Sequence, residues 1–309
     1  MDHGPVGGWD GPMCAMRMHS DEVAIDASLV RRLIARRFPE WAGLPVERLE
    51  SAGTENAMFR LGCDLVVRLP RHPGAVSSIE HEQRWLSLLG PRLPVAVPEP
   101  LGRGGADEEF PWPWSVYGWL DGRNPAVDAL RSPETLAREL AGFVRALRRV
   151  DAGDGPAHAR AVPLSARDTD TRAALARLTG TADRVDTEAV TALWEEALRA
   201  PEHAGPPVWA HADLSPGNVL VTEGRLSAVI DFGCTGIGDP AVDLIVAWNL
   251  LPAGVRDTFR EAVGADDAEW ARGRGWALSI SLIQLPYYRV TNPVLAANSR
   301  HVIREILAE

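Results

Sequence analysis

The spacing of hydrophobic residues divides the chain into a first part with several strands and a longer, mostly helical part. In residues 26–38 apolar side chains recur three or four positions apart, which predicts an amphipathic helix. The same spacing predicts further helices at 77–89, 135–150, 171–178, 188–199, 244–251, 255–263, 268–285 and 298–307. Short apolar runs bounded by turn residues predict strands at 46–49, 57–61, 65–69 and within 110–120.

These patterns predict an α+β fold with two lobes. We expect a small N-terminal antiparallel-sheet lobe over residues 21–118 and a larger, mostly helical lobe over residues 119–309. The aromatic strand within 110–120 would connect the two lobes as a hinge. Residues 1–20 contain no apolar run of the kind found in a signal peptide, and we expect them to form a disordered leader.

One charged residue interrupts each of two apolar patterns in the first lobe. The alternation in strand 65–69 places Arg68 on the opposite face from most of the apolar residues, and helical spacing places Glu82 within the apolar stripe of helix 77–89. Arg68 would reach solvent if its strand lay at the edge of the sheet. Alternatively, Arg68 would bind phosphate oxygens, paired with Glu82, because a buried carboxylate needs a partner.

Three polar residues stand at strand ends in the second lobe. Residues 208–231 are typical of a short strand, a polar turn, a second strand, a Glu-Gly turn and a third strand. Asp213 and Asn218 lie in the polar turn, and Asp231 ends the third strand. Two carboxylates and an amide oxygen suit a hard cation such as Mg²⁺. A carboxylate in this position also suits the orientation of a hydroxyl nucleophile.

Composition excludes several other classes of protein. The 309 residues are 46% hydrophobic, which is typical of a globular protein, and the net charge of −10 argues against broad nucleic-acid binding. The sequence has no apolar run of the length of a membrane span, and its three cysteines are far apart, so we expect a cytoplasmic protein without a structural disulfide framework. Lysine is absent, and any role that lysine usually fills must fall to arginine.

The motifs resemble those of the aminoglycoside phosphotransferase family. The resemblance rests on His-Ala-Asp-Leu-Ser-Pro-Gly-Asn from position 211, Ile-Asp-Phe-Gly from position 230 and Gly-Asp-Pro-Ala-Val-Asp-Leu from position 238. It extends over about residues 45–250 and is strongest at 208–245. It implies a protein-kinase-like fold that binds ATP, with GTP as an alternative, and Mg²⁺.

The resemblance also implies a role for each matching residue. Asp213 matches the catalytic base, and Asn218 and Asp231 match the Mg²⁺ ligands. Arg68 takes the place of the lysine that contacts the nucleotide phosphates, with Glu82 as its partner. Asp243 matches an acid that braces the catalytic loop. The remaining nucleotide contacts would come from the loop and the hinge, at Gly53, Thr54, Asn56, Ser115 and Tyr117.

The implied reaction is transfer of the nucleotide γ-phosphoryl group to a hydroxyl of a small molecule, in the first place an aminoglycoside-type antibiotic. We expect a monomer or weak dimer. A kinase of a macrolide, peptide antibiotic or metabolite is one alternative, and a nucleotide-binding scaffold is another. A protein kinase is disfavoured, because only residues 234–238 separate the Asp-Phe-Gly motif from Asp239-Pro240 and no Ala-Pro-Glu follows.

The sequence gives two sets of candidates for the acceptor site. A polycationic acceptor would need a carboxylate-lined cleft, for which the candidates are Asp168, Asp170, Glu195, Glu196, Asp266, Asp267 and Glu269. A bulkier acceptor would instead use aromatic residues, for which the candidates are Trp270, Trp276, Tyr287 and Tyr288. Solvated surface charge for the first set and core packing for the second are the simpler interpretations.

Overall fold

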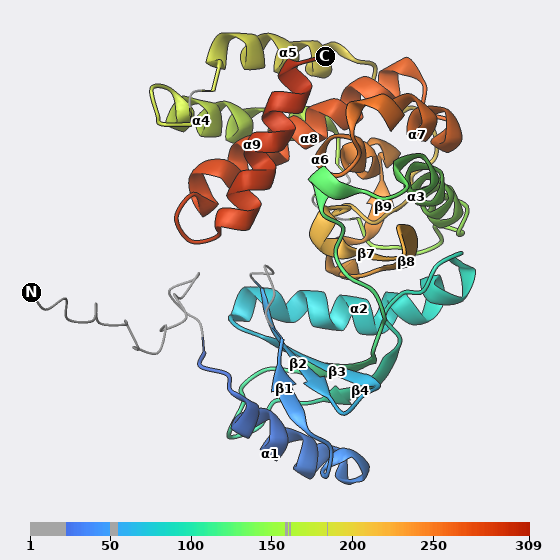
Figure 1. Ribbon diagram of the computed structural model, residues 1–309, viewed down its shortest axis with the longest axis vertical. Coiled ribbons are helices and arrows are strands. Elements are labelled where there is room, and N and C mark those ends of the chain that lie inside the picture. The colour runs from blue at the N-terminus through green and yellow to red at the C-terminus, as the bar shows by residue number, and fades with distance from the viewer. Residues whose placement is uncertain (1–22, 50–54, 158–159, 161, 184) are drawn as a thin grey trace, which may run out of the picture.

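An antiparallel sheet of five strands forms the core of the N-terminal lobe. The structure is a computed structural model that describes residues 23–49, 55–157, 160, 162–183 and 185–309 (Figure 1). The strands follow the order β1-β2-β3-β5-β4 and comprise β1 (Val46–Arg48), β2 (Asn56–Leu61), β3 (Leu65–Pro70), β4 (Pro100–Gly104) and β5 (Trp114–Gly118). Because β3 lies between β2 and β5, the edge-strand interpretation of Arg68 is wrong. Strand β4 was not predicted, since its Pro- and Gly-rich sequence has no alternating pattern.

Two helices cover opposite faces of this sheet (Figure 1). Asp26 caps the N-terminus of helix α1 (Ala27–Arg37), because its carboxylate accepts a hydrogen bond from Leu29 N at 2.8 Å. It packs with the sheet in a cluster that includes Phe59 and Val67. Helix α2 (Val76–Leu89) lies between the sheet and the helical lobe, and its Leu86 and Leu89 belong to the hydrophobic core of the helical lobe. Helix α2 therefore joins the two lobes. The expected leader at 1–20 lies outside the described residues.

The helical lobe is built around α8. Its α-helices are α3 (Pro133–Arg148), α4 (Asp168–Leu178), α5 (Thr187–Arg199), α6 (Val246–Asn249), α7 (Arg256–Val263), α8 (Asp267–Tyr288) and α9 (Pro293–Leu307). Helices α4, α5 and α9 all contact α8, and buried tryptophans such as Trp194, Trp248 and Trp276 fill the core between these elements. The segment predicted as one helix at 244–251 instead forms a 3₁₀ helix at Pro240–Ile245 followed by the short α6.

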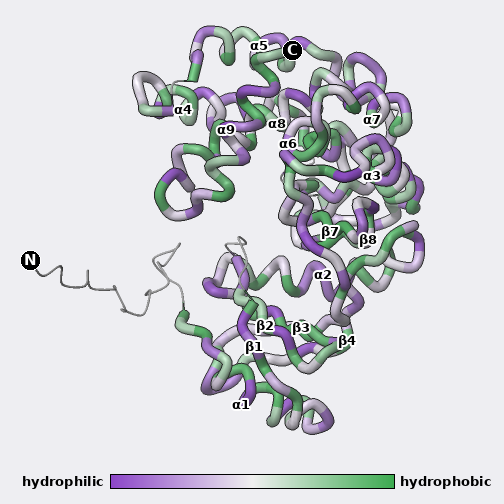
Figure 2. The backbone as a smooth tube through the Cα atoms, viewed as in Figure 1, coloured by the Kyte–Doolittle hydropathy of each residue, from purple (hydrophilic) through white to green (hydrophobic). Residues whose placement is uncertain are grey.

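Hydrophobic and hydrophilic residues alternate along the individual helices (Figure 2). This alternation gives each helix an apolar face that packs into the lobe and a polar face that meets solvent. Over the part of the chain that the structure describes, no helix combines the length and the apolar character needed to cross a membrane.

Two small two-stranded sheets lie at the side of the helical lobe that faces α2 (Figure 1). Strand β7 (Val219–Thr222) pairs with β8 (Arg225–Val229), as the Glu-Gly turn predicts, and β6 (Val208–Ala210) pairs with β9 (Gly236–Gly238), which was not predicted. The expectation of three successive strands was therefore incomplete. The β6–β9 pair matters for the site, because it places the loop after β6 beside the loop before β9.

Strand β4 approaches the sheet core closely at Gly104. Trp114 is 1% exposed and its ring contacts Phe38 edge to face, with centroids 5.7 Å apart. A Cβ atom at Gly104 would lie 1.9 Å from Trp114 Cε2, whereas one at Gly105 would meet no atom within 4 Å. A side chain therefore fits at Gly105 but not at Gly104.

We predict that Gly104→Ala lowers the free energy of unfolding by about 1–3 kcal/mol, because Trp114 must leave its packed position. Gly105→Ala is the matched control and should change it by less than about 0.5 kcal/mol. Urea titration followed by tryptophan fluorescence measures both. Equal stabilities of the two variants would contradict the packing argument.

Candidate active site

A strained backbone turn carries Asp213. Ala212 adopts φ 63°, a left-handed conformation that residues other than glycine rarely adopt. The Asp243 carboxylate holds this turn, accepting hydrogen bonds from Ala212 N at 2.7 Å and from His211 N at 2.9 Å. Asp243 is fully buried, and this burial raises its pKa above the usual value. Asp243 thus braces the loop, as the resemblance implies.

The buried ring of His211 connects this turn to the segment that carries Asp231. Its Nδ1 accepts a hydrogen bond from Asp213 N at 3.3 Å, and its Nε2 donates to the carbonyl of Ile230 at 3.1 Å, which requires the tautomer with the proton on Nε2. The ring also packs edge to face on Phe232, with centroids 4.8 Å apart. The two loops are therefore fixed relative to each other.

Asn218 is oriented by Asp213. Its Nδ2 donates to the Asp213 carbonyl at 2.8 Å and to Asp213 Oδ2 at 3.0 Å. Because these bonds use the amide nitrogen, the amide oxygen is the atom suited to bind a metal ion. Asn124, in the connection between the lobes, donates to the carbonyls of Gly217 and Val219 and supports the same loop.

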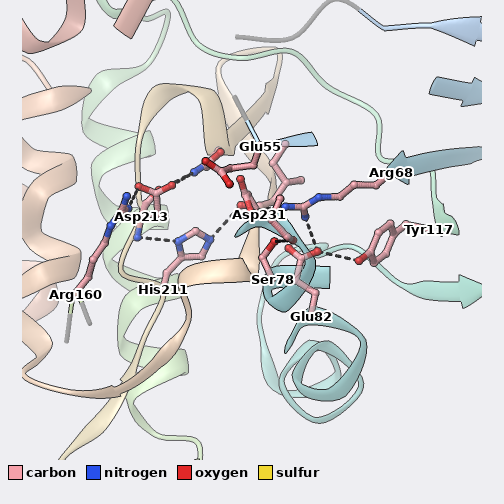
Figure 3. Close-up of polar contacts among 12 residues, drawn as sticks. Glu55, Arg68, Ser78, Glu82, Tyr117, Arg160, His211, Asp213 and Asp231 are labelled. Carbon is pink, nitrogen blue, oxygen red and sulfur yellow. Dashed lines mark hydrogen bonds and ion pairs between the residues drawn. The ribbon is translucent and has the colours of Figure 1, made fainter. Parts of the chain in front are cut away.

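Arg68 joins the N-terminal lobe to Asp231 through a network of ion pairs (Figure 3). Its Nη1 donates to Glu82 Oε2 at 2.5 Å and its Nη2 donates to Asp231 Oδ1 at 3.0 Å. Tyr117 donates its hydroxyl to the same Glu82 oxygen at 2.8 Å. With its side-chain amide oxygen facing the guanidinium, Asn56 accepts from Arg68 Nη2 and Nε at 2.9 and 3.0 Å. The strand-to-helix pair predicted from the sequence is present.

Burial and charge act in opposite directions on this network. Burial disfavours the charged form of Arg68, but Glu82 and Asp231 more than offset it, so the pKa of Arg68 is raised. Partial burial likewise opposes ionisation of Asp231, whose side chain is 43% exposed, but Arg68 and His211 outweigh it and lower the pKa of Asp231. Arg68 and Asp231 are thus held in their charged forms.

Arg160 is a site residue that the sequence analysis missed. It forms an ion pair with Asp213 Oδ1 and donates to the carbonyl of Ala212 at 3.2 Å (Figure 3). The negative charge of the Asp213 carboxylate raises the pKa of the Arg160 guanidinium and outweighs the opposing effect of burial. Arg160 belongs to a loop without apolar periodicity, 53 positions before Asp213, so no local signal in the sequence identifies it.

These residues line one large cavity between the lobes, with a volume of about 780 Å³. Seven of the predicted site residues line it, namely Asn56, Arg68, Glu82, Tyr117, Asp213, Asn218 and Asp231. Ser115 does not, because it lies buried in β5 between β3 and β4 and accepts a hydrogen bond from Gln83 Nε2 at 2.7 Å. Ser115 therefore lies outside the cavity lining, and its contact with the nucleotide stays a prediction. Gly53 and Thr54 lie outside the described residues.

The acceptor candidates are distributed differently from the expectation. None of the seven acidic candidates lines the cavity. Several are paired elsewhere, such as Glu196 with Arg274 and Glu269 with Arg148. Of the aromatic candidates, Tyr288 lines the cavity, whereas Trp276 is fully buried, Trp270 packs on Trp248 with ring centroids 4.7 Å apart, and Tyr287 is exposed.

The donor atoms at the cavity fit a magnesium ion that is completed by phosphate and water. Asp231 has a side chain that is 43% exposed, and it stands with Asn218 at the cavity wall. Within the described ranges there is no cluster of three or more His, Cys, Asp or Glu side chains that would hold a metal by themselves. Mg²⁺ does not need such a cage, since it commonly takes one or two carboxylates together with substrate phosphates and water.

Comparison with known proteins identifies the family. A model of the phosphotransferase enzyme family matches residues 47–276. The chain belongs to this family. Viomycin phosphotransferase from Streptomyces vinaceus is 32% identical over 209 residues, which are 62% of this chain and 65% of that protein. Aminoglycoside 3'-phosphotransferase from Escherichia coli is 42% identical over 59 residues, 19% of this chain and 22% of that protein. The matched segments thus span less than two thirds of either relative.

Solved structures of this family share the fold. The GDP complex of aminoglycoside 2'-phosphotransferase-IIIa has a TM-score of 0.72 at 18% identity, covering 92% of this chain and 99% of that one. The macrolide 2'-phosphotransferase of Brachybacterium faecium has a TM-score of 0.61 at 24% identity, covering 90% and 97%. The predicted α+β, protein-kinase-like fold and the resemblance to aminoglycoside phosphotransferases are confirmed.

We predict that Asp243→Asn lowers turnover at least tenfold, because one of the two backbone N–H groups loses its acceptor and the left-handed turn at Ala212 relaxes. The buried unsatisfied group should also cost about 1–3 kcal/mol of unfolding free energy. Asp257→Asn, an exposed acid in α7, is the control and should change neither quantity. Wild-type turnover in Asp243→Asn would show that the turn holds its conformation without this brace.

Proposed function

We propose that the protein is a magnesium-dependent phosphotransferase that moves the γ-phosphoryl group of ATP or GTP to a hydroxyl group of a small molecule. The observation that carries the proposal is the pair of acids at one cavity, each held by a different partner. Asp213 is bonded to Asn218 on the helical side, and Asp231 is paired with Arg68 from the N-terminal lobe. A base for the acceptor and a ligand for the metal thus stand at one cavity without being equivalent.

Each residue then has a defined task. Asp213 accepts a hydrogen bond from the acceptor hydroxyl and takes its proton as the oxygen bonds to the γ-phosphorus and the bond to the β-phosphate oxygen breaks. Asn218 and Asp231 would hold Mg²⁺, which when bound neutralises charge on the phosphates. Arg68 binds phosphate oxygens from the other side, and Glu82, Tyr117 and Asn56 fix its guanidinium. Most of the rate enhancement would come from positioning and electrostatics.

Arg160 adds a second cation next to the reacting oxygen. It faces Asp213 from the side opposite to Arg68 (Figure 3). We assign to it the stabilisation of charge that develops on the transferred phosphoryl group.

The acceptor is proposed as a hydroxylated small molecule of the antibiotic class. The names of similar proteins support this proposal. The relatives are a viomycin phosphotransferase and an aminoglycoside phosphotransferase, and the structural neighbours include a macrolide phosphotransferase. The proposal includes both ATP and GTP as phosphate donors, since the structural neighbours include GDP, ADP and ATP complexes.

We predict that Asp213→Ala keeps nucleotide affinity within about threefold but lowers turnover on the order of 100- to 10,000-fold, because it removes the base and not the phosphate contacts. Titration calorimetry with Mg-nucleotide and a coupled assay for ADP or GDP release measure the two quantities. Asp231→Asn is the comparison and should weaken the magnesium-dependent part of nucleotide binding. Turnover near the wild-type value in Asp213→Ala would sink the assignment, and nucleotide binding without turnover in the wild type would favour the scaffold.

We predict that Arg160→Ala lowers kcat on the order of 100-fold with little change in the KM for nucleotide, because it removes one charged donor at the reacting group. Added guanidinium should restore part of the rate, and Arg160→Lys should be intermediate. Arg172→Ala, which removes an exposed arginine of α4, is the matched control and should keep the wild-type rate. A rate loss in Arg160→Ala that guanidinium does not relieve would point to a structural role.

A further inference from the structure

The part of the cavity that adjoins α8 has an uncharged wall. Five residues of α8 line it at positions i, i+3, i+4, i+7 and i+11, which places them on one face of the helix: Ala277, Ile280, Ser281, Gln284 and Tyr288. This face offers apolar surface, hydroxyl groups and an amide. The charged residues of α8 lie in its first half, outside the cavity wall.

Helix α9 continues this wall with the same character. Leu295, Asn298 and Val302 line the cavity at helical spacing. Two exposed valines lie near the junction of these helices: Val290, between α8 and α9, is 72% exposed, and Val294, at the start of α9, is 65% exposed. Among the described residues, the charged side chains that line the cavity all come from outside α8 and α9.

One buried polar atom in this wall has no partner in the described part of the chain. Asn249 is 7% exposed and lines the cavity, and its Oδ1 makes no hydrogen bond there. Its Nδ2 donates to the carbonyl of Leu214 at 2.7 Å, and its own carbonyl accepts from Asn298 Nδ2 at 2.9 Å. The side chain is therefore held in place next to the residue that follows Asp213. A buried acceptor without a donor costs free energy, which a ligand that donates a hydrogen bond recovers.

We infer that α8, α9 and Asn249 form the acceptor subsite, and that it takes a bulky hydroxylated molecule with one positive charge or none, which donates a hydrogen bond to Asn249 Oδ1. The inference rests on the proposed phosphotransfer, with Asp213 next to the subsite. A polycation would lose hydration at this wall without gaining a carboxylate partner from α8 or α9, and each unpaired charge is costly to bury. The acids expected to attract a polycation do not line the cavity.

The test compares two classes of probe on the full chain with Mg-nucleotide. Erythromycin and digoxin represent bulky molecules with one charge or none, and kanamycin represents the polycations. We expect calorimetry to show at least tenfold tighter binding of one of the first two than of kanamycin, with the same order in the rate of nucleotide turnover. Equal or tighter binding of kanamycin would overturn the inference, as would the absence of binding by both erythromycin and digoxin.

Variants of the wall separate the subsite from the catalytic machinery. Gln284→Glu places a carboxylate on the cavity face of α8 and should weaken binding of the preferred probe about tenfold while it strengthens binding of kanamycin. Ala297→Glu, on the exposed face of α9, adds the same charge away from the cavity and should change neither. Equal effects of the two substitutions would refute a specific role for the wall.

Asn249→Leu tests the unpaired oxygen. It should weaken binding of the preferred probe about tenfold and leave nucleotide affinity unchanged, whereas an equal loss of nucleotide affinity would show that Asn249 only supports the catalytic loop. Failure of the inference is distinguishable from failure of the proposed function. The first appears in the selectivity of binding, and the second appears as magnesium-dependent nucleotide turnover that Asp213→Ala does not reduce.

Discussion

The buried ion pair of Arg68 with Glu82 is the constraint on which the site depends. Glu82 is fully buried on α2, so it is stable as a charged group only while Arg68 and the Tyr117 hydroxyl compensate it. The same guanidinium reaches Asp231 of the helical lobe, so one side chain links the sheet, α2 and the proposed metal ligand. Removing a member of this network would leave an unpaired buried charge as well as an incomplete site. Under the proposed function, this fixed geometry lets arginine make the phosphate contact that the family resemblance assigns to a lysine.

A second constraint acts on the other side of the cavity. Ala212, directly before Asp213, and Asp231 itself both have left-handed backbone conformations. Such conformations persist only where neighbouring groups enforce them. Asp243 and His211 supply these groups through hydrogen bonds to the backbone of both loops. The buried polar side chains of Asp243 and His211 therefore orient Asp213 and Asp231. The cavity wall formed by the described residues of α8 and α9 carries no charged side chain. The cavity thus has a charged side, proposed for catalysis, and an uncharged side, proposed for the acceptor.

Sequence reasoning was accurate where a local pattern and a chemical requirement coincided. The apolar stripe of α2, including the buried Glu82, and the order of strands β1 to β3 follow from periodicity alone, because burial on one face repeats along the chain. Strand β4, the β6–β9 pair and the 3₁₀ helix at Pro240–Ile245 did not follow, since short Gly- and Pro-containing segments owe their conformation to neighbours that are distant in sequence. Ser115 likewise lies outside the cavity lining, because its strand is paired on both sides.

The sequence by itself determined the fold class, the family motifs and the arginine–glutamate pair, because each is encoded by residue type at fixed spacing. Only the tertiary structure showed that Arg160 meets Asp213, that the acidic acceptor candidates lie outside the cavity, and that Asn249, which lines it, has a side-chain oxygen without a partner among the described residues. These facts depend on which faces of distant helices and loops meet. That choice is made by packing of the whole lobe, and no single segment of the sequence specifies it.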